Sequence, residues 1–136
     1  MFETFDHTAD VGLRARGATF EEVLIDAARG LLGLVVANPE AVRLVQEEEW
    51  EIAGEDSEYL LFDWLNACLD AFTTRHLLLA DFQLQRTATG LRAVVRGEPL
   101  DPQRHRCEHE VKAITYHGLV CREESAGWLA EVILDI

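Results

Sequence analysis

The sequence predicts an α+β fold with two layers, in which two α-helices pack on one face of a mixed β-sheet. Two segments carry apolar residues at helical spacing, and most of the remaining chain alternates apolar and polar residues with a period of two. The expected order is two strands, a helix, a strand, a helix and four strands, without an internal repeat or linker. Because 136 residues suit one hydrophobic core, we expect a single domain over residues 1–136.

The opening strands are expected over residues 2–5 and 11–16, on either side of the first loop. A helix follows, because Thr19 and Glu22 form a capping box that satisfies free N–H groups at a helix start. Apolar residues then recur every three or four positions. We expect the helix to end before Pro39, since the residue preceding a proline avoids the helical conformation.

The second helix is expected to start at Asp56 or Ser57, since both residue types cap helices well. Its apolar stripe consists of Leu61, Trp64, Leu65, Cys68, Leu69 and Phe72. Alternation predicts the remaining strands. They cover residues 42–52, a hairpin of 82–85 and 91–95 with its turn at Thr89-Gly90, and a second hairpin of 112–121 and 128–134.

Composition narrows the classes of function. The net charge of −13 repels phosphate backbones, which argues against direct high-affinity binding of nucleic acid. It favours solubility, cations or a basic protein partner, and the alternative is that the charge only keeps an acidic protein soluble. No apolar run reaches the ~18 residues of a membrane span, and the first residues lack a secretory signal. Three cysteines without metal-site spacing argue against a disulfide framework. We therefore expect a cytoplasmic protein, and a monomer by default.

The loop after the first strand holds one candidate site, residues 6–10 (DHTAD). If the chain turns tightly there, His7 and Asp10 place an imidazole and a carboxylate within reach of one point. The pattern is weak by itself, because aspartate and threonine in loops commonly serve only to cap backbone amides.

The last two residues form a second candidate. Asp135 and the α-carboxylate of Ile136 are adjacent anionic groups at the end of a predicted strand. They repel each other unless a cation compensates, and carboxylate oxygens suit magnesium, calcium or manganese better than zinc. The alternative is that both carboxylates point into water.

The third candidate is the segment 110–117 (EVKAITYH), which contains the only lysine of the chain. As a buried strand it directs Lys112 to one face of the sheet and His117 to the other. The alternative for His117 is a hydrogen-bonded histidine of the core. The nearby residues 104–106 form a local basic patch, but we interpret Arg104 and Arg106 as part of an ordinary solvated loop. The sequence contains no nucleophile elbow, P-loop, dinucleotide fingerprint or serine–histidine–aspartate order.

Together these segments resemble the archease family. The resemblance rests on residues 6–12 (DHTADVG), residues 110–117 (EVKAITYH) and the closing Asp135-Ile136. Supporting matches are Leu60-Leu61, Trp64-Leu65-Asn66, residues 97–101 (GEPLD) and His105. The resemblance covers essentially the whole chain, with residues 37–58 as its least diagnostic part.

Archeases are accessory proteins of the RtcB-type RNA ligase, which joins a 2′,3′-cyclic phosphate or 3′-phosphate end to a 5′-hydroxyl in tRNA splicing and RNA repair. They promote guanylylation of the ligase and its multiple turnover. The resemblance therefore implies an archease-like fold and an activating protein rather than an enzyme, with this ligase as partner. It also implies a divalent cation, calcium above all, with magnesium or manganese as alternatives. The implied ligands are Asp10, Asp135 and the terminal carboxylate of Ile136, and His7, Lys112 and His117 are functional neighbours without an assigned role.

Three hypotheses about function remain open. The first is non-catalytic activation of RNA ligation by a protein with a metal site. The second is a small metal-dependent phosphohydrolase with His7 or His117 as base, which needs an enclosed pocket rather than a cluster at a sheet edge. The third is a chaperone-like modulator of a tRNA methyltransferase, an older proposal for the family. Because residues 10 and 135 lie at predicted strand ends, we expect them to meet at one edge of the sheet.

Overall fold

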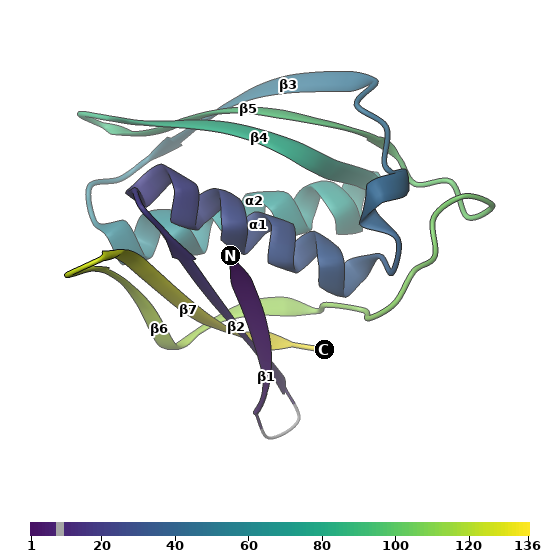
Figure 1. Cartoon of the computed structure of the whole chain (residues 1–136). Coiled ribbons are helices and arrows are strands. Elements are labelled where there is room, and N and C mark those ends of the chain that lie inside the picture. Colours follow the sequence, from purple (N-terminus) through teal and green to yellow (C-terminus); the bar gives the residue numbers. More distant parts are fainter. Residues whose placement is uncertain (8–9) are drawn as a thin grey trace.

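The computed structural model describes residues 1–7 and 10–136, and of Asp6 and His7 only the backbone. In chain order the elements are β1 (Phe2–His7), β2 (Asp10–Gly17), α1 (Phe20–Val35), the short 3-10 helix η1 (Pro39–Ala41), β3 (Gln46–Ala53), α2 (Ser57–Arg75), β4 (Leu77–Thr87), β5 (Gly90–Pro99), β6 (Ala113–Glu124) and β7 (Gly127–Asp135). The strands form a four-stranded sheet, ordered β1-β2-β7-β6, and a three-stranded sheet, ordered β3-β5-β4. Both helices lie between the two sheets (Figure 1).

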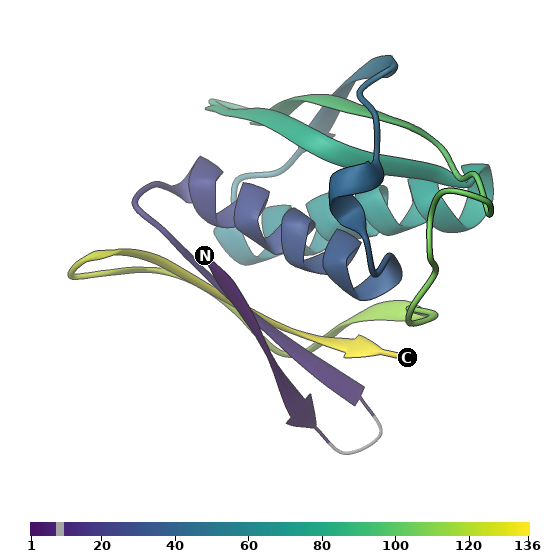
Figure 2. The same ribbon diagram turned by 45° about the vertical axis from the view of Figure 1, so that its right-hand side comes forward.

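The predicted α+β class and the order of helices and strands are confirmed, but the single mixed sheet covered on one face is wrong. All strand pairings among the described residues are antiparallel, and they fall into two sheets. The first and last hairpins join into one sheet through the pairing of β2 with β7. The sheet β3-β5-β4 is separate and covers the opposite side of the helices (Figure 2). A helix between two sheets needs apolar residues around most of its circumference. Helix α1 meets this need, since ten of its sixteen residues are buried.

Both helices begin where their capping residues predict. The Thr19 hydroxyl accepts the N–H of Glu22 at 3.1 Å, and the Glu22 carboxylate accepts the N–H of Ala18 at 2.9 Å. Asp56 caps α2, where its carboxylate accepts two N–H groups of the first turn. Caps of this kind contribute about 1 kcal/mol each. Neither described helix is long and apolar enough to cross a membrane.

Trp64 joins the helices to the three-stranded sheet at the centre of the core. Its side chain is completely buried, and its Nε1–H donates to the carbonyl oxygen of Leu24 at 2.9 Å, which links α2 to α1. Its ring makes edge contacts with Trp50 of β3 and Phe82 of β4, at centroid distances of 5.9 and 5.7 Å. The two helices and this sheet therefore share one packed interior.

Strand β3 begins later than the predicted residues 42–52. The reason is that the backbone N–H of Arg43 donates to the side-chain carboxylate of Glu98 at 2.7 Å, instead of to a neighbouring strand. The N–H of Val45 then bonds the carbonyl oxygen of Gly97, and the β3–β5 ladder follows. Both predicted hairpins, β4–β5 and β6–β7, are confirmed, and their strands extend beyond the predicted ends except at the start of β6, which begins at Ala113 rather than at residue 112.

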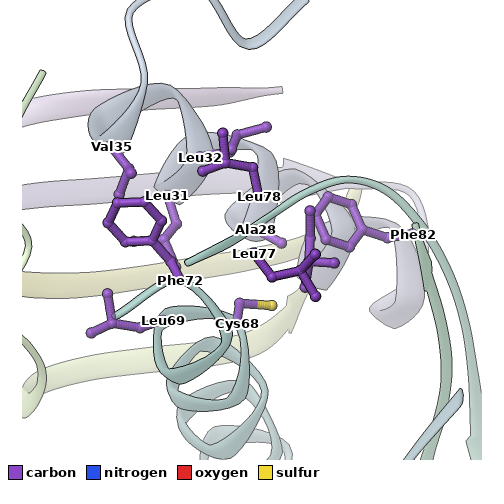
Figure 3. A pocket seen from close by; sticks show the side chains of 11 residues that line it. Ala28, Leu31, Leu32, Val35, Cys68, Leu69, Phe72, Leu77, Leu78 and Phe82 are labelled. Atoms are coloured by element: carbon purple, nitrogen blue, oxygen red, sulfur yellow. The ribbon is translucent and has the colours of Figure 1, made fainter. Parts of the chain in front are cut away.

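A small apolar cavity lies between α1, α2 and the start of β4 (Figure 3). Its volume is about 20 Å³. Aliphatic and aromatic side chains line it, together with the thiol of Cys68. Ligand sites in proteins are roughly 300–1,000 Å³ and carry a few polar groups. This cavity is therefore too small and too apolar for a ligand site, and it is a small imperfection of the packing.

Candidate functional site

Strand register brings the two predicted aspartates together at one end of the four-stranded sheet. Strands β2 and β7 pair so that Asp10 lies opposite Asp135. Strands β1 and β2 pair so that His7 lies opposite Asp10, and Ala113 of β6 lies opposite Asp135. His7, Asp10, Asp135 and Ala113 therefore form one row across all four strands. Residues 8 and 9 of the predicted loop lie outside the described residues.

The row of aspartates lies on the outer face of the sheet. Leu13 and Leu134 are almost completely buried against the helices, and side chains alternate between faces along a strand. Asp10 and Asp135 consequently point away from the helices, and both are half-buried. Directly opposite residues place their Cβ atoms about 4.5–5.5 Å apart on the same face. Ile136 follows with its side chain against the core, so its α-carboxylate lies one residue beyond this pair.

The chemistry of these groups fits a hard divalent cation. Carboxylate oxygens are the ligands that calcium, magnesium and manganese prefer, and these two carboxylates come from directly opposite positions of neighbouring strands. Within the described residues, no three His, Cys, Asp or Glu side chains are arranged to hold a metal ion. The predicted set has only two such side chains, Asp10 and Asp135, because its third ligand is the terminal carboxylate. The metal site stays a prediction.

Lys112 contacts the row of His7, Asp10, Asp135 and Ala113 through a backbone hydrogen bond. Its N–H donates to the carbonyl oxygen of Asp135 at 2.7 Å, just before β6 begins at Ala113. Its side chain is exposed, so the prediction of a buried strand at this residue is wrong. The backbone of the only lysine in the chain is therefore next to Asp135, and its side chain is presented to solvent.

His117 lies outside the row, in a bulge of β6. The register shifts between the pairs Thr115–Ile133 and Val120–Glu131. Four residues of β6 lie between these pairs, against one residue of β7, so β6 carries three extra residues here. Gly118 adopts a left-handed φ of 68°, which favours glycine and lets the strand depart from its regular course. His117 is exposed. The alternative of a core histidine is therefore wrong, and the predicted alternation of the segment 110–117 ends at Thr115.

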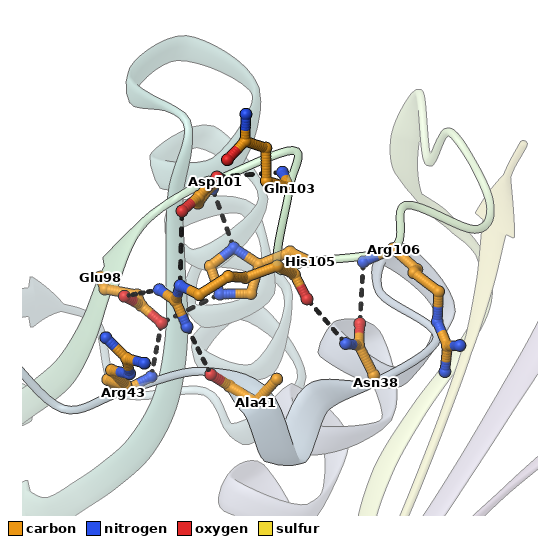
Figure 4. A network of polar contacts seen from close by, with 9 residues as sticks. Asn38, Ala41, Arg43, Glu98, Asp101, Gln103, His105 and Arg106 are labelled. Carbon is orange, nitrogen blue, oxygen red and sulfur yellow. Dashed lines mark hydrogen bonds and ion pairs between the residues drawn. The ribbon is translucent and has the colours of Figure 1, made fainter.

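A buried polar network that the sequence reasoning missed joins Glu98 to His105 (Figure 4). Their exposed fractions are 5% and 2%. The Glu98 carboxylate bonds Nε2 of His105 at 2.9 Å, accepts the N–H of Arg43 at 2.7 Å and pairs with Arg104. Nδ1 of His105 accepts the N–H of Asp101 at 2.9 Å. The imidazole is therefore the neutral tautomer that donates from Nε2.

This network ties the segment between β5 and β6 to the region of η1. Asn38 extends it by donating to the carbonyl oxygen of Arg104 and accepting the N–H of Arg106, at 2.9 and 2.8 Å. Arg104 is thus an organised part of the fold, and its interpretation as a solvated loop residue is wrong, whereas the Arg106 side chain is exposed as predicted. Burial by itself raises the pKa of Glu98, but the donors around its carboxylate outweigh this effect and hold the pKa below its usual value.

Comparison with known proteins decides the family. The model of the archease protein family matches residues 2–136 of this chain. The chain belongs to the archease family. Among its archease relatives, the protein of Methanopyrus kandleri is 36% identical over 139 residues, covering 99% of both chains. The archease of Pyrococcus abyssi is 36% identical over 140 residues, covering 99% of this chain and 98% of the relative.

Solved structures agree with the archease assignment. Protein 1598 of Methanobacterium thermoautotrophicum has a TM-score of 0.83 and 33% identity, covering 99% of this chain and 98% of that one. An archease of Thermotoga maritima, described as a possible chaperone, has a TM-score of 0.68 and 24% identity, covering 100% and 98%. At that identity the second likeness shows the fold alone. Both support an archease fold of two helices and two antiparallel sheets.

Proposed function

We propose that this chain activates an RtcB-type RNA ligase in tRNA splicing and RNA repair, by promoting guanylylation of the ligase and its multiple turnover. The observation that carries the proposal is the convergence of the three segments on which the family resemblance rests. Strand register brings residues 6, 7 and 10–12, the start of 110–117 and the end of β7 to one end of the four-stranded sheet. Segments this far apart in sequence meet at one accessible place, as a functional surface requires.

A divalent cation at this sheet end is part of the proposal. Asp10, Asp135 and the terminal carboxylate of Ile136 would hold it, with calcium, magnesium or manganese as candidates. When bound, the cation supplies a positive charge at which a nucleotide triphosphate or a group of the ligase can be positioned. His7 and Lys112 flank these carboxylates through the strand register and the backbone bond to Asp135.

The charge of the chain suits this partner. An RNA ligase needs a basic cleft for its substrate, and a protein with a net charge of −13 is electrostatically complementary to such a surface. The attraction favours association with the protein rather than with the RNA itself, because phosphate groups are repelled.

The proposed function is tested by multiple-turnover RNA ligation with and without this chain. We expect acceleration only when the RtcB-type ligase is present, and a larger guanylylated fraction of the ligase. Product formation by the chain alone would instead identify a metal-dependent enzyme. No change in ligation rate at saturating chain would contradict the proposal.

The proposed cation site is tested separately by calorimetric titration of calcium and magnesium. Asp10→Asn, Asp135→Asn and a one-residue extension after Ile136 should each weaken binding by at least about tenfold. Asp63→Asn is the matched control, because it removes the same charge from an exposed position of α2. Affinity that is unchanged in all three site variants would rule out these ligands.

A chaperone-like role is the second candidate, because the Thermotoga maritima structure that shares this fold is described as a possible chaperone. In that case the chain would bind a tRNA methyltransferase and alter its activity. The ligation assay separates the two candidates, since a methyltransferase partner would leave the ligation rate unchanged.

A further inference from the structure

Two tyrosines form an exposed stack where the bulge of β6 meets the first turn of α2. The ring of Tyr116 lies 5.4 Å from that of Tyr59, at an interplanar angle of 28°. Phe62 supports the pair by an edge contact with Tyr116, also at 5.4 Å. Tyr116 and Tyr59 nevertheless remain 43% and 56% exposed. The stack therefore keeps much of its aromatic surface in solvent.

The β6 bulge creates this arrangement. The extra residues of β6 begin at Tyr116, directly after the last regular pair at Thr115, and Gly118 supplies the left-handed conformation. A Cβ atom added at Gly118 would meet no described atom within 4 Å apart from those of its chain neighbours, so this point of the bulge faces open space in the described part of the chain. Bulges interrupt the ladder of backbone hydrogen bonds and re-aim side chains. Here the bulge moves Tyr116 onto α2 without covering it.

Negative charges lie beside the stack. Asp56 and Glu58 belong to the start of α2 on either side of Ser57, immediately before Tyr59. Burial, the hydrogen bond with Tyr59 and the charges of these acidic groups raise the pKa of Tyr116, so its phenol stays neutral at physiological pH. Arg86 approaches the same helix start, where its guanidinium donates to the hydroxyl of Ser57 at 3.0 Å and to the Glu55 carbonyl oxygen at 2.6 Å.

We propose that Tyr59 and Tyr116 form a docking site for an arginine side chain of a basic protein partner. A planar guanidinium stacks on a tyrosine ring by cation–π attraction, and Glu58 can pair with its charge. A lysine carries the same charge without the planar group, so its fit is poorer. Nucleic-acid bases also stack on tyrosine, but the neighbouring carboxylates and the net charge of −13 repel phosphates. The docking site requires a basic partner but not the RtcB-type ligase in particular.

The docking site is tested by titrating the full chain with a short arginine–glycine peptide, and with its lysine–glycine counterpart, while NMR follows the tyrosine ring signals. We expect the arginine peptide to shift the signals of Tyr59 and Tyr116 and to bind more tightly than the lysine peptide. Tyr59→Ala or Tyr116→Ala should weaken its affinity by about tenfold, whereas Tyr116→Phe should stay within about twofold.

Charge is tested by a matched pair of variants. Glu58→Gln should weaken binding at low salt, and this loss should diminish at high salt because screening removes the pairing. Glu49→Gln on the exposed face of β3 makes the same charge change away from the stack and should have no effect. Thermal unfolding of every variant checks that the fold is retained.

Three results would overturn the docking site. The first is wild-type affinity for the arginine peptide in both alanine variants, and the second is equal affinity for the arginine and lysine peptides. The third is a shift of the ring signals by oligouridylate but not by the arginine peptide, which would identify a platform for RNA bases instead.

Discussion

Replacing Glu98 with alanine tests how much the buried network stabilises this fold. The substitution leaves the Nε2–H of His105, whose side chain is 0% exposed, without an acceptor. It also removes the acceptor of the Arg43 N–H and the partner of the Arg104 guanidinium. Breaking a buried charged pair from one side costs about 3–5 kcal/mol. Because the Arg104 side chain is 28% exposed and can regain water, we expect the lower end, about 3 kcal/mol.

Urea unfolding followed by circular dichroism measures this loss. With a slope of about 2 kcal/mol/M for a chain of this size, the midpoint should fall by roughly 1.5 M. Glu47→Ala is the control, since it removes an exposed ion pair. Glu47 pairs with Arg96 at 2.8 Å, and their side chains are 52% and 39% exposed, respectively. Surface pairs of this kind contribute about 0–1 kcal/mol. Equal losses for the two variants would refute the view that burial makes the Glu98 network important.

The remaining predictions concern pH, the thiols and a helix cap. The pKa of Glu98 lies below its unfolded value of about 4.3, so its contribution is fully present above that value and is lost as pH falls through the folded pKa. The difference in unfolding free energy between wild type and Glu98→Ala should therefore shrink in urea curves recorded below about pH 4. A difference that does not depend on pH would contradict the lowered pKa of Glu98. Cys107 is exposed and should react with a thiol reagent in the native protein, whereas Cys68 and Cys121 should react only after unfolding; mass spectrometry counts the labels. Burial raises the pKa of Cys121 to about 12, so native labelling at this position would contradict its environment. Thr19→Ala should lower the free energy of unfolding by about 1 kcal/mol, and an unchanged urea midpoint would show that its cap contributes nothing.

Local signals in the sequence were sufficient for the helices and hairpins. Thr19 and Asp56 cap the helices because their side-chain oxygens reach N–H groups only two or three residues away. The division into two sheets could not be predicted in this way. Alternation shows which face of a strand is buried but does not show which distant strand it pairs with, and the β2–β7 pairing joins the two ends of the chain.

The candidate site was predicted in part. The expected meeting of residues 10 and 135 is present in the strand register, because both lie at strand ends. Glu98 was missed because a glutamate near the end of a strand is normally solvated, and only the fold brings the Arg43 backbone and His105 to its carboxylate. A signal for the β6 bulge was available, since Gly118 interrupts an otherwise continuous strand pattern.

The most direct test of the proposed function is multiple-turnover ligation by the RtcB-type ligase with aspartate variants of this chain. Wild-type protein and the control Asp63→Asn should accelerate ligation. Asp10→Ala and Asp135→Ala should fail to do so while keeping the circular dichroism spectrum of the wild type. Full acceleration by both alanine variants would contradict a role of these two carboxylates in activation.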